Sequence, residues 1–213
     1  VLGSRGLGDV YKRQHEDLGT IRREPETVAK EAEAFGTKYV VITGMYRFDY
    51  ADKAAVQRLC RDLNTSGKIL KEAGIELLYH NHNCEFLHVE QQKTAYDLLL
   101  SETDPEYVNF ELDSYWPTEA GVDALALMKK LDTRMKLYHI NDRGTRLLKP
   151  AMTPILKSDS MELGCGNMNL DALITQAKNV NVDAVILESH KNWVDNSPLR
   201  SLEISAQFLN ARI

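Results

Sequence analysis

The sequence predicts an α/β fold, a partial (β/α)8 or TIM barrel with about five of the eight βα units present. Predicted strands and helices alternate from residue 25 onward, and the strands are almost continuously apolar, as in a parallel sheet covered by helices. No Gly-x-Gly-x-x-Gly turn follows a first strand, which disfavours a dinucleotide-binding fold. A complete barrel has about 250 residues, whereas this chain has 213, so we expect a truncated barrel.

Two helices and two strands are predicted in the first half of the chain. Pro25 suits the first turn of a helix, which Gly36 ends. The inward stripe of this helix is Val28, Ala32 and Phe35. A short apolar strand, a long amphipathic helix and a second strand are then predicted at residues 38–44, 52–73 and 75–80.

The second half of the chain repeats this alternation. Its strands are short apolar runs, and its helices carry an apolar stripe at helical spacing. In chain order we expect a helix at 92–101, a strand at 107–113, a helix at 121–131, a strand at 135–140, a loop at 144–160, a helix at 170–179, a strand at 184–188 and a helix at 198–211.

Residues 1–14 differ from the rest of the chain, because they have neither a helical nor a strand period and no apolar face. The run at 10–14 resembles the translated adapter sequence that ends many metagenomic fragments. We therefore expect residues 1–14 to be a non-native or disordered leader. Residues 15–213 are expected to form one domain, the truncated barrel.

Composition and charge limit the class of function. A formal net charge of −5 argues against a nucleic-acid-binding protein, which would carry a basic face. No apolar run reaches the length of a transmembrane helix, so no membrane partner is expected. The three cysteines have no paired spacing, which favours a reducing compartment, the cytoplasm.

Side chains able to bind a metal stand at the ends of the last four predicted strands. In chain order they are His80 with His82, Asp113, His139 and Glu188. The carboxyl ends of parallel barrel strands share one face, so these groups should converge. Singly, each has a structural alternative as a hydrogen-bonded histidine, a helix N-cap or a solvated carboxylate. Together they favour a site for Mn²⁺, Zn²⁺, Co²⁺ or Fe²⁺.

Other polar groups near these strand ends have two interpretations each. Glu111 faces the same way as Asp113, so it either supports a ligand or forms an ion pair inside the barrel. Trp116 either forms an apolar wall for a sugar face or packs at the rim. Arg143 either holds a phosphate or carboxylate, or forms a surface ion pair with Asp142.

A Gly-x-Gly turn at Gly164 and Gly166 precedes the helix predicted at 170–179. Two glycines allow the backbone to approach a ligand closely, and a helix N-terminus favours anionic oxygens. An N-cap by Asn167 or Asn169 explains part of this pattern without a ligand.

Several motifs of the chain resemble the sugar phosphate isomerase/epimerase superfamily, the xylose isomerase-like barrels. They are Tyr-His-Asn-His-Asn-Cys-Glu-Phe at 79–86, Glu-Leu-Asp-Ser-Tyr-Trp at 111–116 with Ala-Gly-Val-Asp at 120–123, Tyr-His-Ile-Asn-Asp-Arg at 138–143, Glu-Leu-Gly-Cys-Gly at 162–166 and Val-Ile-Leu-Glu-Ser-His at 185–190. The resemblance covers roughly residues 25–213 and implies that the predicted strands are strands four to eight of the barrel.

The resemblance implies one divalent ion, Mn²⁺, Zn²⁺, Co²⁺, Fe²⁺ or Mg²⁺, bound by residues from the last four strands. Asp113, His139 and Glu188 match the last three ligand positions of the family. Many members have Glu-Asn-His at the first position, where this chain has His-Asn-His. Either His80 takes the place of that first ligand, or Glu85 reaches in from the following loop.

The resemblance also implies an activity. We expect an isomerase or epimerase that acts on a sugar, sugar phosphate or polyol through metal-stabilised ene-diolate chemistry, with Glu188 or His82 as the base. The family pairs two glutamates as acid and base, whereas this chain has a histidine at the first position. A lyase is therefore an alternative to the isomerase or epimerase. That lyase would be of the inosose-dehydratase-like type, acting on a keto-polyol or keto-glycoside, and a non-catalytic sugar-binding barrel is a third reading.

The expected partner is a small carbohydrate, and a homo-oligomer is compatible with the sequence. An isolated part of the barrel can be inactive even where the complete protein is an enzyme. The residues expected to contact the substrate are Glu85, Trp116, Asp142, Arg143 and Glu162.

Overall fold

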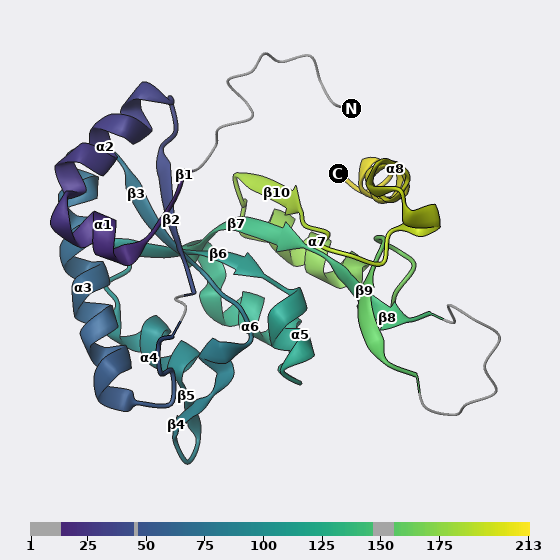
Figure 1. Ribbon diagram of the computed structural model, residues 1–213, viewed down its shortest axis with the longest axis horizontal. Coiled ribbons are helices and arrows are strands. Elements are labelled where there is room, and N and C mark those ends of the chain that lie inside the picture. Colours follow the sequence, from purple (N-terminus) through teal and green to yellow (C-terminus); the bar gives the residue numbers. More distant parts are fainter. Residues whose placement is uncertain (1–13, 45–46, 147–155) are drawn as a thin grey trace.

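The centre of the protein is a parallel sheet that curls around an inner face (Figure 1). The computed structural model describes residues 14–44, 47–146 and 156–213. Six strands of the sheet lie in chain order: β1 (Gln14–Glu16), β2 (Tyr39–Thr43), β3 (Glu76–His80), β6 (Val108–Asp113), β7 (Met135–Ile140) and β10 (Ala184–Leu187). Each neighbouring pair is parallel, so all the carboxyl ends lie along one edge.

Helices connect these strands and cover the outer face of the sheet. They are α1 (Leu18–Arg23), α2 (Pro25–Ala34), α3 (Lys53–Glu72), α4 (Ala95–Glu102), α5 (Tyr115–Glu119), α6 (Ala124–Leu131), α7 (Leu170–Asn179) and α8 (Pro198–Asn210). Helices α1, α2 and α3 contact one another along one flank of the sheet (Figure 1). Among the residues described, no helix is long and apolar enough to cross a membrane.

Side-chain caps explain where several helices begin. Asp52, Thr94 and Asp123 each accept a hydrogen bond from a backbone amide in the first turn of α3, α4 and α6. At α4 the cap is reciprocal, because the Asp97 carboxylate also accepts from the Thr94 amide. Such caps satisfy amides that have no partner inside the helix, and each stabilises the folded chain by about 1 kcal/mol.

The alternation predicted from sequence is confirmed, but the count of five units is not. The short polar strand β1 adds a further parallel strand beside β2, and α1 follows it. The sequence Gln-His-Glu has no apolar run that would predict a strand, and its pairing alone defines it. Residue 14, assigned above to the leader, begins β1, whereas residues 1–13 of that predicted leader lie outside the described residues.

Shorter elements were also missed. Helix α5 follows β6 directly, and two hairpins lie between larger elements: β4 (His88–Glu90) with β5 (Lys93–Thr94), and β8 (Asp142–Thr145) with β9 (Ser158–Met161). The second hairpin occupies both ends of the loop predicted at 144–160, of which residues 147–155 lie outside the described residues. The inward position expected for Phe35 is wrong, because this residue ends α2 and its surface is 57% exposed.

Side chains alternate between the two faces of each strand, and this alternation divides the core. The larger cluster lies between the sheet and the helices and includes Val40, Ile42 and Leu77. A smaller cluster lies on the inner face and consists of Tyr39, Val41, Leu78 and Leu137, with Ala184 and Ile186 packed against it. Inner-face positions nearer the carboxyl ends are polar, so the apolar inner cluster forms a floor beneath them.

A polar contact ties β2 to the strand at the far end of the sheet. The Tyr39 hydroxyl donates to the carboxylate of Asp183, the residue before β10, and Lys38 Nζ lies 2.5 Å from the same carboxylate. Because β2 and β10 are not neighbours in the sheet, this contact spans the amino-terminal side of the inner face and holds the sheet in its curled form.

Gly67 marks a close approach between α3 and the segment that leads into β6. A Cβ at this position would lie 2.3 Å from the carbonyl oxygen of Tyr107. Alanine is favoured over glycine inside helices by about 1 kcal/mol. Here the added Cβ would clash with backbone atoms, and we expect the cost of this clash to exceed the gain in helix propensity. We expect Gly67→Ala to lower the free energy of unfolding by about 1–3 kcal/mol, measured by urea unfolding followed by circular dichroism.

The matched control is Thr65→Ala, on the exposed side of the same helix. It gains helix propensity without a clash, so it should leave stability within about 0.5 kcal/mol of the unchanged protein. A Gly67→Ala protein as stable as this control would contradict the proposed close packing.

Candidate metal centre

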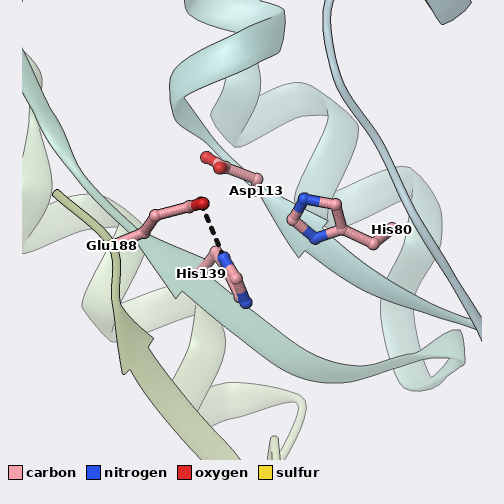
Figure 2. A group of neighbouring side chains, drawn as sticks. All are labelled: His80, Asp113, His139 and Glu188. Carbon is pink, nitrogen blue, oxygen red and sulfur yellow. Dashed lines mark hydrogen bonds and ion pairs between the residues drawn. The ribbon is translucent and has the colours of Figure 1, made fainter. Parts of the chain in front are cut away.

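Four side chains from neighbouring strand ends meet above the apolar floor (Figure 2). His80 and Asp113 are the last residues of β3 and β6, His139 lies near the end of β7, and Glu188 directly follows β10. One potential ligand atom from each residue lies within 4.8 Å of the others. The convergence of these four strand ends follows from the parallel sheet.

His80 is available as a neutral ligand. Its surface is 3% exposed, and among the described residues its Nδ1 atom is buried with no hydrogen-bond partner. Burial, with the nearby His139 and His82, lowers the pKa of His80 to about 2, so the ring is uncharged at neutral pH. A buried nitrogen without a partner is costly, and a bound cation would supply the missing interaction.

Asp113 is held rigidly at the end of β6. Its Oδ1 accepts from the Tyr115 amide at 2.8 Å. The Asn81 side chain donates to the backbone carbonyl of Asp113 and accepts from its amide, each at 3.1 Å. Asn141 Nδ2 lies 3.4 Å from the other carboxylate oxygen. These contacts fix the direction in which the carboxylate points.

Asp113 and Glu188 are two like charges in one buried place. Burial, followed by the hydrogen bond and charge of Glu188, holds the pKa of Asp113 well above its ordinary value. Burial also acts to raise the pKa of Glu188, but hydrogen bonds with His139 and Asp113 outweigh it and lower that pKa overall. A cation bound between the two carboxylates would reduce this unfavourable interaction.

His139 lies between two carboxylates. Its Nδ1 is 2.8 Å from Glu188 Oε2, on the side of the four-residue group (Figure 2). Its Nε2 is 2.5 Å from Glu111 Oε1, on the inner face beneath. A carboxylate on the remote ring nitrogen fixes the tautomer and orientation of a ligating histidine. This contact is compatible with both roles considered for Glu111, a carboxylate that supports a ligand and a member of an ion pair inside the barrel.

The donor set fits a divalent cation. Two imidazoles and two carboxylates at one point are typical of sites for Zn²⁺, Mn²⁺, Co²⁺ or Fe²⁺, whereas Mg²⁺ prefers oxygen ligands. The buried Nδ1 of His80 lacks a partner among the described residues, and such an ion would provide one.

Glu85, the alternative first ligand, lies outside this group of four. It is fully buried in the short 3-10 helix η2 (Cys84–Phe86). Its Oε1 accepts from the Tyr79 hydroxyl at 2.9 Å, and its Oε2 accepts from the His82 amide at 2.9 Å. The carboxylate therefore holds the turn after β3, whose direction sets the positions of His80 and His82.

His82 and Trp116 lie beside the four-residue group. The His82 ring is 5.1 Å from the His80 ring and 5.4 Å from the Trp116 ring, measured between centroids. A cavity of about 110 Å³ lies beside them, and Trp116, Asn141 and His190 are among the residues that line it. His190 Nε2 is 2.8 Å from Glu188 Oε1, which connects this cavity to the metal centre.

The remaining predicted contact residues belong to a neighbouring network. The Asp142 carboxylate accepts from backbone amides of the glycine turn, and Glu162 accepts from the Ser201 hydroxyl at 2.6 Å and pairs with Arg146. Arg143 Nε is 2.6 Å from Glu119, so the ion pair of Arg143 is with this residue and not with Asp142, the partner in one of its two readings. None of these three predicted residues is in the group of four.

The residues that hold the four candidate ligands, Glu111, Asn81 and Asn141, were harder to predict from the sequence than the ligands themselves. Glu111 could be found from its spacing to Asp113, because alternate strand residues share a face. The roles of Asn81 and Asn141 depend on contacts between strands, and no sequence pattern predicted them. The glycine turn leads into α7 as expected, with Asn169 accepting from the Ala172 amide as its N-cap.

Curated relatives match part of this chain. A protein named inosose dehydratase from Mesomycoplasma hyopneumoniae is 32% identical over 93 residues, which is 44% of this chain and 30% of that protein. A protein of the same name from Clostridium perfringens is 36% identical over 84 residues, 39% of this chain and 27% of that protein. The matches thus span less than a third of these relatives.

Solved structures share the fold at low sequence identity. A sugar phosphate isomerase/epimerase from Parabacteroides distasonis superposes with a TM-score of 0.77 at 22% identity, covering 96% of this chain and 75% of that one. AsbF of Bacillus anthracis, described as a probable 3-DHS dehydratase, gives a TM-score of 0.71 at 16% identity, covering 95% of this chain and 77% of that one. The IOLI protein with a bound zinc atom gives 0.67 at 17%, covering 93% and 74%.

The family model of the xylose isomerase-like TIM barrel matches residues 16–212, nearly the whole described chain. The curled parallel sheet, with its polar side chains at the carboxyl ends, agrees with this match. The chain belongs to the xylose isomerase-like TIM barrel family.

Proposed function

We propose that the protein is a divalent-metal-dependent isomerase or epimerase of a polyhydroxy carbonyl compound, such as a sugar, sugar phosphate or polyol. The observation that carries this proposal is the convergence of His80, Asp113, His139 and Glu188 at one point. A divalent ion bound there would act as a Lewis acid toward a substrate carbonyl. The solved structure of the IOLI protein with zinc, which shares the fold, is consistent with such an ion.

Glu188 is the proposed base that removes the proton from the carbon next to the carbonyl. Its side chain is 23% exposed, the largest exposure among the four donors, and its lowered pKa keeps it ionised at neutral pH. His139 and His190 each contact one of its oxygens and can stabilise its charge between proton transfers. His82, beside Trp116, is the proposed acid that returns a proton to the substrate.

Dehydration is the second candidate. The first ligand position holds His80 in place of a glutamate, so the site lacks the second glutamate of the isomerase pattern. His82, beside His80, is then the histidine that would protonate a departing hydroxyl. The curated relatives named inosose dehydratase support this candidate, as does the AsbF dehydratase fold. Both candidates begin with the same proton removal and differ in the next step, which is either return of the proton or loss of a hydroxyl.

Loss of a ligand should abolish metal binding. We expect His139→Ala and Asp113→Ala each to weaken binding of Zn²⁺ or Mn²⁺ by about 100-fold or more, because each removes a donor from the buried set. Equilibrium dialysis with elemental analysis measures this. His88→Ala, which changes an exposed histidine on β4, is the control and should bind metal normally. Full metal content in both ligand variants would refute the site.

Glu111 should act on the metal through His139. We expect Glu111→Gln to weaken metal binding by about 10–100-fold and to change the visible spectrum of the Co²⁺-substituted protein, since the histidine loses its charged partner. Glu76→Gln makes the same change at the amino end of β3 and should alter neither property. A Co²⁺ spectrum identical to that of the unchanged protein would exclude a positioning role.

The fate of the substrate separates the two candidates. Incubation of the metal-loaded protein in D₂O with ketoses and a keto-cyclitol should incorporate solvent deuterium next to the carbonyl in either case. An isomerase or epimerase returns a product of unchanged composition, and a dehydratase releases water, as seen by mass spectrometry and NMR. Glu188→Gln should lose deuterium incorporation by a factor of about 100 or more. Exchange that survives in this variant would remove Glu188 as the base.

A further inference from the structure

A chain of hydrogen bonds between buried side chains ends at the turn that carries His82. The Tyr50 hydroxyl lies 2.8 Å from the Tyr79 hydroxyl, which itself donates to Glu85 Oε1 at 2.9 Å. Because Tyr79 has a single hydroxyl proton, Tyr50 is the donor in the first of these contacts. Glu85 Oε2 then accepts from the His82 amide at 2.9 Å. The chain thus links the segment before α3 to the turn after β3.

The Glu85 carboxylate is held firmly in this chain. It is fully buried, and each of its oxygens has a donor, with Cys84 Sγ 3.3 Å from Oε2 in addition. Burial, followed by the charge of Glu85, raises the pKa of Tyr79 well above its ordinary value, so its hydroxyl stays protonated and remains a donor. Displacing the carboxylate would leave buried polar atoms unsatisfied, which is costly.

Gly44, directly after β2, leaves the space in which one edge of the His82 ring lies. A Cβ at this position would be 2.9 Å from His82 Nδ1 and 2.9 Å from Glu85 Oε1. On its other sides the ring has His80 and Trp116, at 5.1 and 5.4 Å between ring centroids. Groups at the carboxyl ends of β2, β3 and β6 therefore surround the ring, and they limit the directions in which it can point.

Four residues that bound the ring or hold its turn form a socket: Gly44, Tyr50, Tyr79 and Glu85. We propose that this socket aims His82 at the substrate, with Glu85 as a positioning residue for the proposed acid. The inference rests on the proposed function, in which Glu188 removes a proton and His82 gives one to the substrate. No member of the socket is in the group of four candidate ligands. A change in the socket should therefore impair the second proton transfer and leave the metal and the first transfer in place.

Two variants disturb the socket at different points. Tyr79→Phe removes the donor to Glu85, and Gly44→Ala places a methyl group where His82 lies. Each metal-loaded variant is incubated in D₂O with D-fructose, D-ribulose and 2-keto-myo-inositol. We expect product formation to fall about 10–100-fold, because the acid is displaced, and deuterium incorporation into recovered substrate to stay within about threefold. Mass spectrometry and NMR measure both quantities, and either variant suffices if circular dichroism shows that the other does not fold.

A second measurement needs no substrate. In the Zn²⁺-loaded protein with isotope-labelled histidine, the ring signals of His82 report its orientation, because the Trp116 ring lies beside it. We expect both variants to move these signals, which are assigned by their loss in His82→Ala. The signals of His139, held between Glu111 and Glu188, should stay in place, and so should the metal content.

Tyr96→Phe is the matched control. The Tyr96 hydroxyl on α4 is as buried as that of Tyr79, but it has no hydrogen-bond partner among the described residues, so its removal should change none of these properties. Equal losses of exchange and product formation in the socket variants, or unmoved His82 signals, would overturn the inference and leave the proposed function intact. If the unchanged protein neither exchanges nor converts any of the three compounds, the proposed function fails, and the inference fails with it.

Discussion

The side-chain alternation of parallel strands is the constraint on which the rest of the structure depends. Because successive residues face opposite sides, the inner face carries Tyr39, Val41 and Leu78 low in the sheet and His80 and Glu111 near its carboxyl edge. Apolar packing below thus supports polar groups above. A shift of one residue in any strand register would exchange the two sets between the faces, so the fold and the candidate metal centre are specified together.

Burying two carboxylates and two imidazoles at one point opposes folding, and the surrounding contacts offset part of that cost. Asp113 is held by amide donors, and His139 is held between Glu111 and Glu188. Such an arrangement favours an ion thermodynamically, since the ion relieves like-charge repulsion and the desolvation of His80 at once.

The sequence predicted the elements whose signals are local and missed those defined by distant contacts. Apolar runs and glycine stops were enough to place β2, β3, β6, β7 and β10 and the longer helices. Strand β1 is three polar residues recognised only through pairing with β2. The four candidate ligands could be predicted because each stands at a strand end. The sequence could not predict that Asp142 and Glu162 accept hydrogen bonds from other parts of this chain. Their partners lie about 20 to 40 residues away.

The tie between Tyr39 and Asp183 has a mechanical consequence for the candidate base. Strand β10 pairs only with β7 among the described strands, so its second restraint is this contact at its beginning. Its other end is held as well, because the Glu188 amide donates to the Ile140 carbonyl at 3.2 Å. With the backbone of β10 fixed at both ends, any movement at this position belongs to the Glu188 side chain. That side chain is the most exposed of the four donors, at 23%, so it has the most room to turn between the atoms that exchange a proton.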